Sequence, residues 1–339
     1  MEKNPLVSIV LPIYNGEEFM EKSIKSCLNQ TYKNIELIIV NDNSIDNTFN
    51  IVNKIIQKDG RVKLVNNKTN LKLPKSLNIG HAIAKGDYIT WTSHDNLYLP
   101  NAIEKMVAIL NDKKLNIDIV YSDFYLINQK GEITKTLKLK EPEELIFKNT
   151  IGACFLYKKK VFLENKGYNE ELFLVEDYDF WLRSFFKFKF YHLNSILYNY
   201  REHSKSLTNE IIENNNSKKV LWQDNILKMT HNISTMYSYP DKLKEFILEF
   251  QIHNKINSNE IIENFNDITL FFKRISTKNN VSFNNLLCSL KEKYIKGVRN
   301  KPELQTIKSS LYLLLFYKVL NFNDYKTMVK IFTHKLFKL

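Results

Sequence analysis

Apolar runs of strand length alternate with helical stripes along the first hundred residues of the chain. The apolar runs cover Leu6–Pro12, Ile35–Val40, Val62–Val65 and Tyr88–Thr92. Between them, apolar residues recur at helical spacing over Glu17–Asn29, around Ile51–Ile56 and over Pro74–Ala84. Strands that alternate with helices in this way form open, largely parallel sheets. The pattern therefore predicts an α/β fold with a Rossmann-like, mainly parallel sheet flanked by helices.

The pattern continues less regularly after Pro100. Further predicted helices are Ala102–Leu110, Lys160–Asn165 and Glu176–Phe186, and further strands are Ile117–Ser122, Ile151–Tyr157 and Phe188–Arg201. Near Asn209 the amino-acid composition becomes rich in Asn, Glu and Lys. From there on, apolar residues recur at helical spacing and glycine is rare. We therefore predict a first domain over residues 1–209 and a helical C-terminal region over residues 210–339.

The net charge of the chain limits the kinds of molecule that it is expected to bind. The chain has 339 residues, a net charge of +12 and 44% hydrophobic residues, as expected for a folded protein with an anionic partner. A nucleotide, an acidic membrane surface or simply a solvated basic surface would each account for the charge. No basic-aromatic motif of a nucleic-acid module appears, so we expect no nucleic acid partner. Cys27, Cys154 and Cys288 lack metal-site spacing, and the sequence shows neither a secretory signal nor a membrane span, which favours the cytoplasm.

Polar side chains follow three of the predicted strands. Tyr14 and Asn15 come after the first strand, Asp42 after the second, and Ser93-His94-Asp95 after the fourth. Open α/β sheets bind ligands at the carboxyl ends of their strands. A Ser-His-Asp turn is nevertheless equally suited to ending a strand and to holding a metal, so the segment alone leaves both interpretations open.

Four motifs in one order carry a family resemblance. They are Val7–Asn15, Glu36–Ser44, Gly86–Asp95 and Glu176–Arg183. Their order and spacing resemble the GT-A glycosyltransferases of family 2, inverting enzymes that use nucleotide sugars, and the resemblance covers Leu6 to Thr208. It implies a GT-A fold, a nucleotide-sugar donor and a divalent metal, Mn²⁺ or Mg²⁺.

The resemblance implies a donor site built from the first two motifs. Asp42 would accept the uracil imide hydrogen and Tyr14 would stack on the ring, with Pro12 and Asn15 beside them. Capping of the next helix by Asp42 and simple packing of Tyr14 are the alternatives. The stretch Asn70–Gly80 matches the family in part and contributes two expected donor contacts. These are Lys72, where glycine is common in the family, and Asn78.

The family's Asp-x-Asp metal motif falls on Ser93-His94-Asp95, so one carboxylate of the pair is absent. Asp95 is the expected metal ligand. Ser93 suits the ribose or a metal-bound water, and His94 would favour Mn²⁺ if it points inward. In the run Tyr200-Arg201-Glu202-His203, His203 is expected to return to the metal and Arg201 to meet a phosphate oxygen. Solvent-facing histidines are the alternative.

The Glu-Asp motif of the family falls on Glu176-Asp177, and Asp177 is the expected general base. Glu176 and Asp179 would tune its pKa or contact the acceptor, and Trp181 would offer an apolar face to a sugar ring. The alternative is an acidic first turn that complements the helix dipole.

These residues predict an inverting glycosyltransferase that moves a sugar from a UDP-linked donor to a hydroxyl. The acceptor class implied by the family is a surface glycan such as capsule or lipopolysaccharide, or a lipid-linked oligosaccharide. A catalytically inactive nucleotide-sugar or glycan-binding module is the main alternative, because one metal carboxylate is missing. A sugar nucleotidyltransferase is less favoured, because Pro12–Gly16 lacks a glycine-rich phosphate loop. An amphipathic basic segment over Met328–Phe337 suggests peripheral contact with the inner face of an anionic membrane, with packing on its own domain as the alternative.

Overall fold

The computed structural model describes residues 4–212, 217–278, 281–300, 312–321 and 323–324. The chain divides into two compact units, residues 1–145 with 149–225 and residues 146–148 with 226–339. The first unit extends beyond the predicted boundary near Asn209. Its extension is held by the side-chain amide of Asn225, which donates to the carbonyl of Phe173 at 2.8 Å.

One mixed sheet forms the centre of the first unit. Within the described ranges it has nine strands in the order β3-β2-β1-β4-β8-β6-β9-β5, with β7 beside β6. The strands are β1 (Val7–Ile13), β2 (Ile35–Asn41), β3 (Val62–Asn66), β4 (Tyr88–Trp91), β5 (Leu97–Tyr98), β6 (Ile119–Ile127), β7 (Ile133–Leu137), β8 (Phe155–Lys158) and β9 (Phe190–Arg201). Strands β3, β2, β1 and β4 are parallel, as are β6 and β9, whereas β5, β7 and β8 run antiparallel to their neighbours. The predicted α/β fold with a Rossmann-like first half is confirmed.

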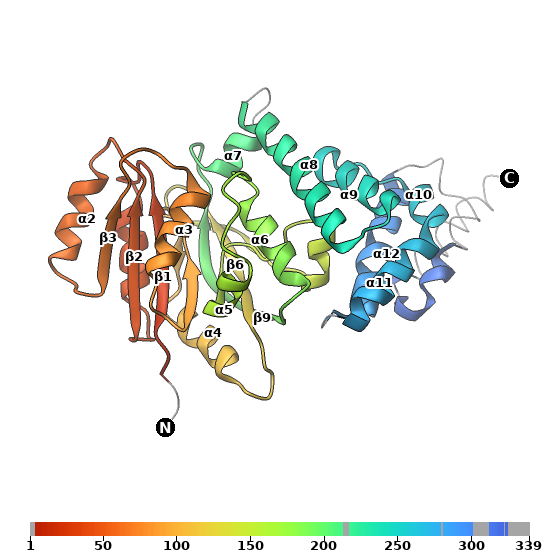
Figure 1. Cartoon of the computed structure of the whole chain (residues 1–339), viewed down its shortest axis with the longest axis horizontal. Coiled ribbons are helices and arrows are strands. Elements are labelled where there is room, and N and C mark those ends of the chain that lie inside the picture. Colours follow the sequence, from red (N-terminus) through yellow and green to blue (C-terminus); the bar gives the residue numbers. More distant parts are fainter. Residues whose placement is uncertain (1–3, 213–216, 279–280, 301–311, 322, 325–339) are drawn as a thin grey trace. The chain divides into compact units, whose positions relative to one another are not determined.

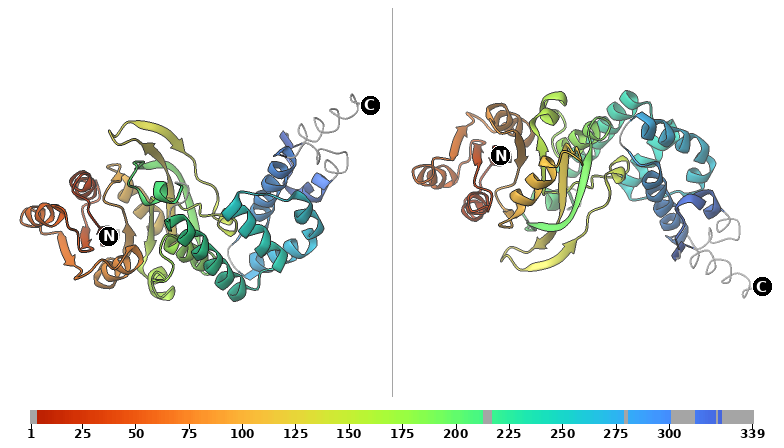
Figure 2. Two further views of the ribbon diagram at one scale, coloured as in Figure 1. Left: turned by 90° about the horizontal axis from the view of Figure 1, so that it is seen from above. Right: turned by 90° about the horizontal axis from the view of Figure 1, so that it is seen from below.

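Helices pack on both faces of this sheet (Figures 1 and 2). The helices of the first unit are α1 (Met20–Leu28), α2 (Thr48–Ile56), α3 (Leu73–Ile83), α4 (Ala102–Asn111), α5 (Lys159–Glu164), α6 (Glu176–Phe185) and α7 (Leu207–Ile212), and the 3-10 helix η1 (Pro142–Ile146) lies mostly in this unit. Every residue of β1 and β2 is buried. Because each fully buried aliphatic side chain contributes about 1.5–3 kcal/mol, these two strands hold the core together.

The structure differs from the predicted elements where the chain bends. The strand predicted over Ile151–Tyr157 begins only at Phe155, because Gly152 takes a φ of +68°, outside the strand region. The strand predicted to end at Ser122 continues to Ile127 and pairs with β7, which the sequence pattern missed.

The second unit is helical, which confirms the predicted helical C-terminal region. It contains the part of α8 (Ser217–Tyr237) from Ile226 onward, α9 (Asp241–His253), α10 (Ser258–Glu263), α11 (Phe265–Lys278), α12 (Phe283–Asn300) and the 3-10 helix η3 (Leu313–Val319). Across the described ranges, no helix is at once long enough and apolar enough to cross a bilayer. The amphipathic segment predicted over Met328–Phe337 lies outside the described residues.

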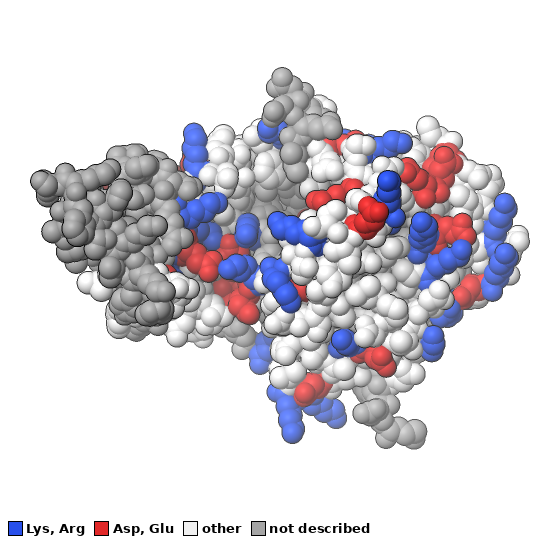
Figure 3. All heavy atoms as spheres, turned by 180° about the vertical axis from the view of Figure 1, so that it is seen from behind, with Lys and Arg blue, Asp and Glu red and all other residues white. Residues whose placement is uncertain are grey.

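Figure 3 shows how charge is distributed on one face of the molecule. Lys and Arg side chains are dispersed among Asp and Glu rather than gathered in one basic patch. Both signs of charge are therefore interspersed on this face.

Candidate active site

A pocket of about 820 Å³ lies at the carboxyl ends of β1, β2 and β4 in the first unit. The segments that follow these strands, Pro12–Phe19, Asp42–Asp46 and Ser93–Asn96, supply much of its lining. The start of α3 and the segment after β9 complete the wall. The volume is that of a small-molecule site, and the position is the one at which open α/β sheets bind ligands.

Asp42 provides a buried hydrogen-bond acceptor in this wall and is 4% exposed. Its Oδ1 accepts the side-chain amide of Asn67 at 2.7 Å and the backbone N–H of Leu71 at 2.8 Å. Its Oδ2 accepts the backbone N–H of Lys72 at 2.9 Å. Since a carboxylate oxygen can accept two hydrogen bonds, Oδ2 retains the capacity to accept a further donor from the pocket. The Tyr14 ring, 45% exposed, lines the same pocket.

Lys72 has a backbone conformation that belongs to glycine. Its φ is +71° and its ψ is 169°, a region that costs other residues about 1–3 kcal/mol. The Lys72 N–H reaches Asp42 from this conformation, which accounts for the glycine that is common at this position in the resembled family. Lys72 also lines the pocket, together with the predicted donor contacts Pro12, Asn15 and Ser93.

Asp95 and His203, both predicted as metal ligands, come together in the pocket. Strand β9 brings His203 back to the end of β4, where its Nε2 lies 2.9 Å from Asp95 Oδ2. Asp95 is 8% exposed, and its Oδ1 is buried without a hydrogen-bond partner among the described residues. His94 lines the pocket, and burial lowers the pKa of its imidazole while the Asp95 charge opposes this shift.

Two groups here have the chemistry of divalent-cation ligands. Asp95 Oδ1 has no partner among the described residues, whereas His203 Nε2 is hydrogen-bonded to Asp95 Oδ2, so a bound ion would have to replace that hydrogen bond. Mn²⁺ accepts both donor types and Mg²⁺ favours the oxygen. In the described part of the chain, no group of three or more His, Cys, Asp or Glu side chains is arranged to hold a metal. The protein alone therefore offers an incomplete coordination shell.

Arg201 lies behind the site rather than in it, and is 2% exposed. Its Nε donates to the carbonyl of Asp95 at 2.9 Å, and its Nη1 donates to the carbonyls of Asn128 and Gln129 at 3.0 and 2.9 Å. The guanidinium also stacks 4.7 Å from the ring centroid of Phe19. These contacts differ from the expected phosphate contact, because carbonyl groups already engage the guanidinium. They fix the backbone that carries Asp95.

Glu176 and Asp177 occupy the first turn of α6. Asp177 is partly exposed, and its Oδ1 accepts the N–H of Tyr178 at 2.7 Å while its Oδ2 accepts the side-chain amide of Asn149 at 2.9 Å. Burial raises the pKa of Asp177. Burial, together with the neighbouring charge of Asp177, raises the pKa of Glu176 to about 8. Glu176 is 4% exposed, and its Oε2 has no hydrogen-bond partner among the described residues.

Tyr200 lines the pocket, whereas Glu176 and Asp177 are not among its lining residues. Burial raises the pKa of the Tyr200 hydroxyl. The sequence pattern gave Tyr200 no role. It also missed Asn149, because no local pattern marks a contact over this sequence distance.

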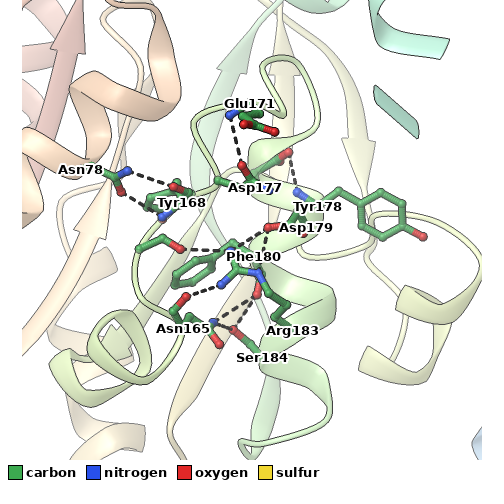
Figure 4. Close-up of polar contacts among 12 residues, drawn as sticks. Asn78, Asn165, Tyr168, Glu171, Asp177, Tyr178, Asp179, Phe180, Arg183 and Ser184 are labelled. Atoms are coloured by element: carbon green, nitrogen blue, oxygen red, sulfur yellow. Dashed lines mark hydrogen bonds and ion pairs between the residues drawn. The ribbon is translucent and has the colours of Figure 1, made fainter. Parts of the chain in front are cut away.

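Asn78, Asp179 and Trp181 have structural roles instead of the expected contacts. The Asn78 side chain donates to the carbonyl of Tyr168 at 2.9 Å and accepts its N–H at 2.8 Å, so it holds the loop before α6 (Figure 4). Asp179, 3% exposed, pairs with Arg183 at 2.7 Å. The prediction that Trp181 faces a sugar was wrong, because its ring is 0% exposed and packs in the aromatic core.

Comparison with solved structures defines the class of fold. The crystal structure of S. aureus TarS 1-349 in complex with UDP-GlcNAc matches with a TM-score of 0.57 and 15% identity, covering 97% of this chain and 92% of that one. The mannosyltransferase PcManGT of Pyrobaculum calidifontis, solved with GDP-Man and Mn²⁺, matches with a TM-score of 0.54 and 12% identity, covering 98% of this chain and 88% of that one. The fold is therefore that of the GT-A glycosyltransferases.

Sequence comparison gives the family. Residues 8–165 match Glycosyl transferase family 2. An uncharacterized glycosyltransferase of Rickettsia prowazekii is 34% identical over 237 residues, which cover 67% of this chain and 73% of that protein. A relative from Rickettsia felis is also 34% identical, and the match spans 39% of its length. The chain belongs to glycosyl transferase family 2, as predicted.

Proposed function

We propose that this chain is an inverting glycosyltransferase that moves a sugar from a UDP-linked donor to a hydroxyl of a surface glycan or a lipid-linked oligosaccharide. One observation carries the proposal. A single pocket is lined both by Asp42, with its remaining acceptor capacity, and by Asp95, with its buried oxygen that lacks a partner. A UDP-sugar carries an imide N–H on its uracil ring and a charged diphosphate between its ribose and its sugar, which matches these two groups.

In this proposal the nucleobase of the donor lies against Asp42 and Tyr14. Asp42 Oδ2 accepts the imide hydrogen of uracil, and the Tyr14 ring stacks on its face. The complex of TarS with UDP-GlcNAc supports a uridine donor. Guanine also carries a ring N–H, and the PcManGT complex holds GDP-Man, so GDP-linked donors belong in the test.

Asp95 and His203 would hold Mn²⁺ or Mg²⁺. When bound, the ion neutralises the negative charge that develops on the departing diphosphate. Arg201 keeps the Asp95 backbone in place, and Ser93 replaces the first carboxylate of the family's Asp-x-Asp motif with a neutral hydroxyl.

Asp177 acts as the general base. As the acceptor oxygen attacks the anomeric carbon opposite the diphosphate, its proton passes to the Asp177 carboxylate while the bond from the anomeric carbon to the phosphate oxygen breaks. A raised pKa makes this carboxylate a stronger base near neutral pH. Glu176, with a pKa of about 8, stays protonated at neutral pH, so the pair carries a single negative charge.

The acceptor class rests on the family resemblance. A lipid-linked acceptor would place the protein peripherally on the inner face of the membrane, which its charge of +12 supports. The full chain should then co-sediment with vesicles that contain anionic lipid, and removal of residues 325–339 should weaken this binding. Equal binding of the truncated and full chains would show that residues 325–339 do not contribute to membrane binding.

A donor screen tests the enzymatic proposal. Thermal shifts with UDP-glucose, UDP-galactose, UDP-GlcNAc and GDP-mannose, each with Mn²⁺, identify the donor that stabilises the native state. Release of the nucleoside diphosphate from that donor should require Mn²⁺, and the substitution Asp95→Ala should abolish this release. Asp112→Ala, at an exposed aspartate after α4, is the matched control and should retain it. Tight UDP binding without release on any acceptor would instead indicate an inactive binding module.

A further inference from the structure

Two residues of the segment before β8, Leu145 and Asn149, contact the first turn of α6. The Tyr178 hydroxyl donates to the carbonyl of Leu145 at 2.8 Å. The Asn149 amide donates to Asp177 Oδ2 at 2.9 Å, and the Tyr178 N–H occupies Oδ1 at 2.7 Å. With one donor on each oxygen, the orientation of the Asp177 carboxylate is fixed, and each oxygen keeps a lone pair for a proton.

We propose that Asn149 is a positioning residue for the Asp177 carboxylate. The proposal rests on the proposed function of Asp177 as the general base.

The hydrogen bond from Asn149 also stabilises the charged form of Asp177 and opposes the effect of burial on its pKa. The other titratable groups that interact electrostatically with Asp177 are Glu176, Tyr168 and Tyr200. Because Glu176 and Asp177 interact strongly, the pH profile reports apparent pKa values of the pair. Removal of the amide donor should move the acidic side of the kcat profile to higher pH.

The test compares substitutions at Asn149 in the full chain. Asn149→Ala should lower kcat about tenfold to a hundredfold, with a donor KM within about twofold, because misplacement of the base affects the chemical step. Its acidic pH limb should move upward, and Asn149→Asp should move it further by placing a second carboxylate beside the base. Asn149→Gln keeps an amide donor and should recover part of kcat. An acidic limb that stays at the wild-type pH in both Asn149→Ala and Asn149→Asp would overturn the proposal, whatever the change in kcat.

Asp177→Asn distinguishes failure of this inference from failure of the proposed function. If Asp177→Asn retains wild-type turnover, the assignment of the base is wrong. If Asp177→Asn is inactive while Asn149→Ala matches the wild type in kcat and pH profile, Asp177 remains the general base, and the proposal that Asn149 positions it is wrong.

Discussion

His81 offers a stability prediction whose size follows from its surroundings. The residue lies on α3, is 1% exposed and stacks on Phe162 at a centroid distance of 4.7 Å. Its Nδ1 is 2.7 Å from the carbonyl of Leu77, and its Nε2 is 2.7 Å from the hydroxyl of Tyr157. A carbonyl only accepts, so Nδ1 carries the proton, and neutral Nε2 accepts from the tyrosine.

Burial lowers the pKa of His81 from 6.5 to about 4. The unfolded chain therefore takes up this proton near pH 6.5, whereas the folded chain takes it up only near pH 4. A group whose folded pKa is depressed stabilises the fold fully above its unfolded pKa, and that contribution is lost as the pH falls. Between pH 7 and pH 4 the loss should be about 3 kcal/mol, at 1.36 kcal/mol for each pKa unit.

His81→Phe removes the titration and keeps an aromatic ring. Urea unfolding of both proteins at pH 7, 6, 5 and 4 can be followed by tryptophan fluorescence, because Trp91, Trp181 and Trp222 all lie in the first unit. The free energy of unfolding of the wild type, minus that of His81→Phe, should fall by about 3 kcal/mol from pH 7 to pH 4. A constant difference across this range would refute the reasoning, because it would mean that burial does not disfavour the charged imidazole.

Three further predictions concern the pocket and the base. Lys72→Gly should be about 1 kcal/mol more stable in urea unfolding than Lys72→Ala, because glycine relieves the strain at φ +71° at some cost in chain entropy; equal stabilities would show that no strain is stored there. The folded pKa of Glu176 is raised to about 8 from 4.5, so the free energy of unfolding of the wild type, minus that of Glu176→Gln, should fall by on the order of 3–5 kcal/mol as the pH rises from about 4.5 to about 8; a difference that stays constant over this range would contradict the assignment. In calorimetry, Mn²⁺ should bind at least about tenfold more tightly with UDP present than alone, because the diphosphate completes the shell begun by Asp95 and His203; equal affinities would point to a preformed site.

The sequence predicts the half of the fold that local patterns determine. Strands β1, β2, β3 and β4 are apolar runs, and the residues after them can be placed at one sheet edge because parallel strands end on the same side. Tyr14, Asp42 and Asp95 were predicted to meet there, and all three line one pocket. The pairing of Asp95 with His203 followed from the family resemblance, and the structure brings the two residues to 2.9 Å.

Long-range contacts account for what the sequence did not predict. Asn78 and Arg201 have residue types that suit a phosphate, yet backbone groups from distant segments engage both side chains. Trp181 is one turn beyond the base, but the helix turns its ring into the aromatic core. The hydrogen bond from Asn149 to Asp177 depends on the packing of the segment before β8 against α6, and no periodicity or motif in the sequence predicts this packing.

The most direct test of the account is the turnover of Asp177→Asn measured beside its affinity for UDP. The account predicts that kcat falls by about 10²–10⁴-fold, the usual contribution of a general base, while the Kd for UDP with Mn²⁺ stays within about twofold of the wild type. Turnover of Asp177→Asn at the wild-type rate would contradict the assignment of Asp177 as the base that activates the acceptor.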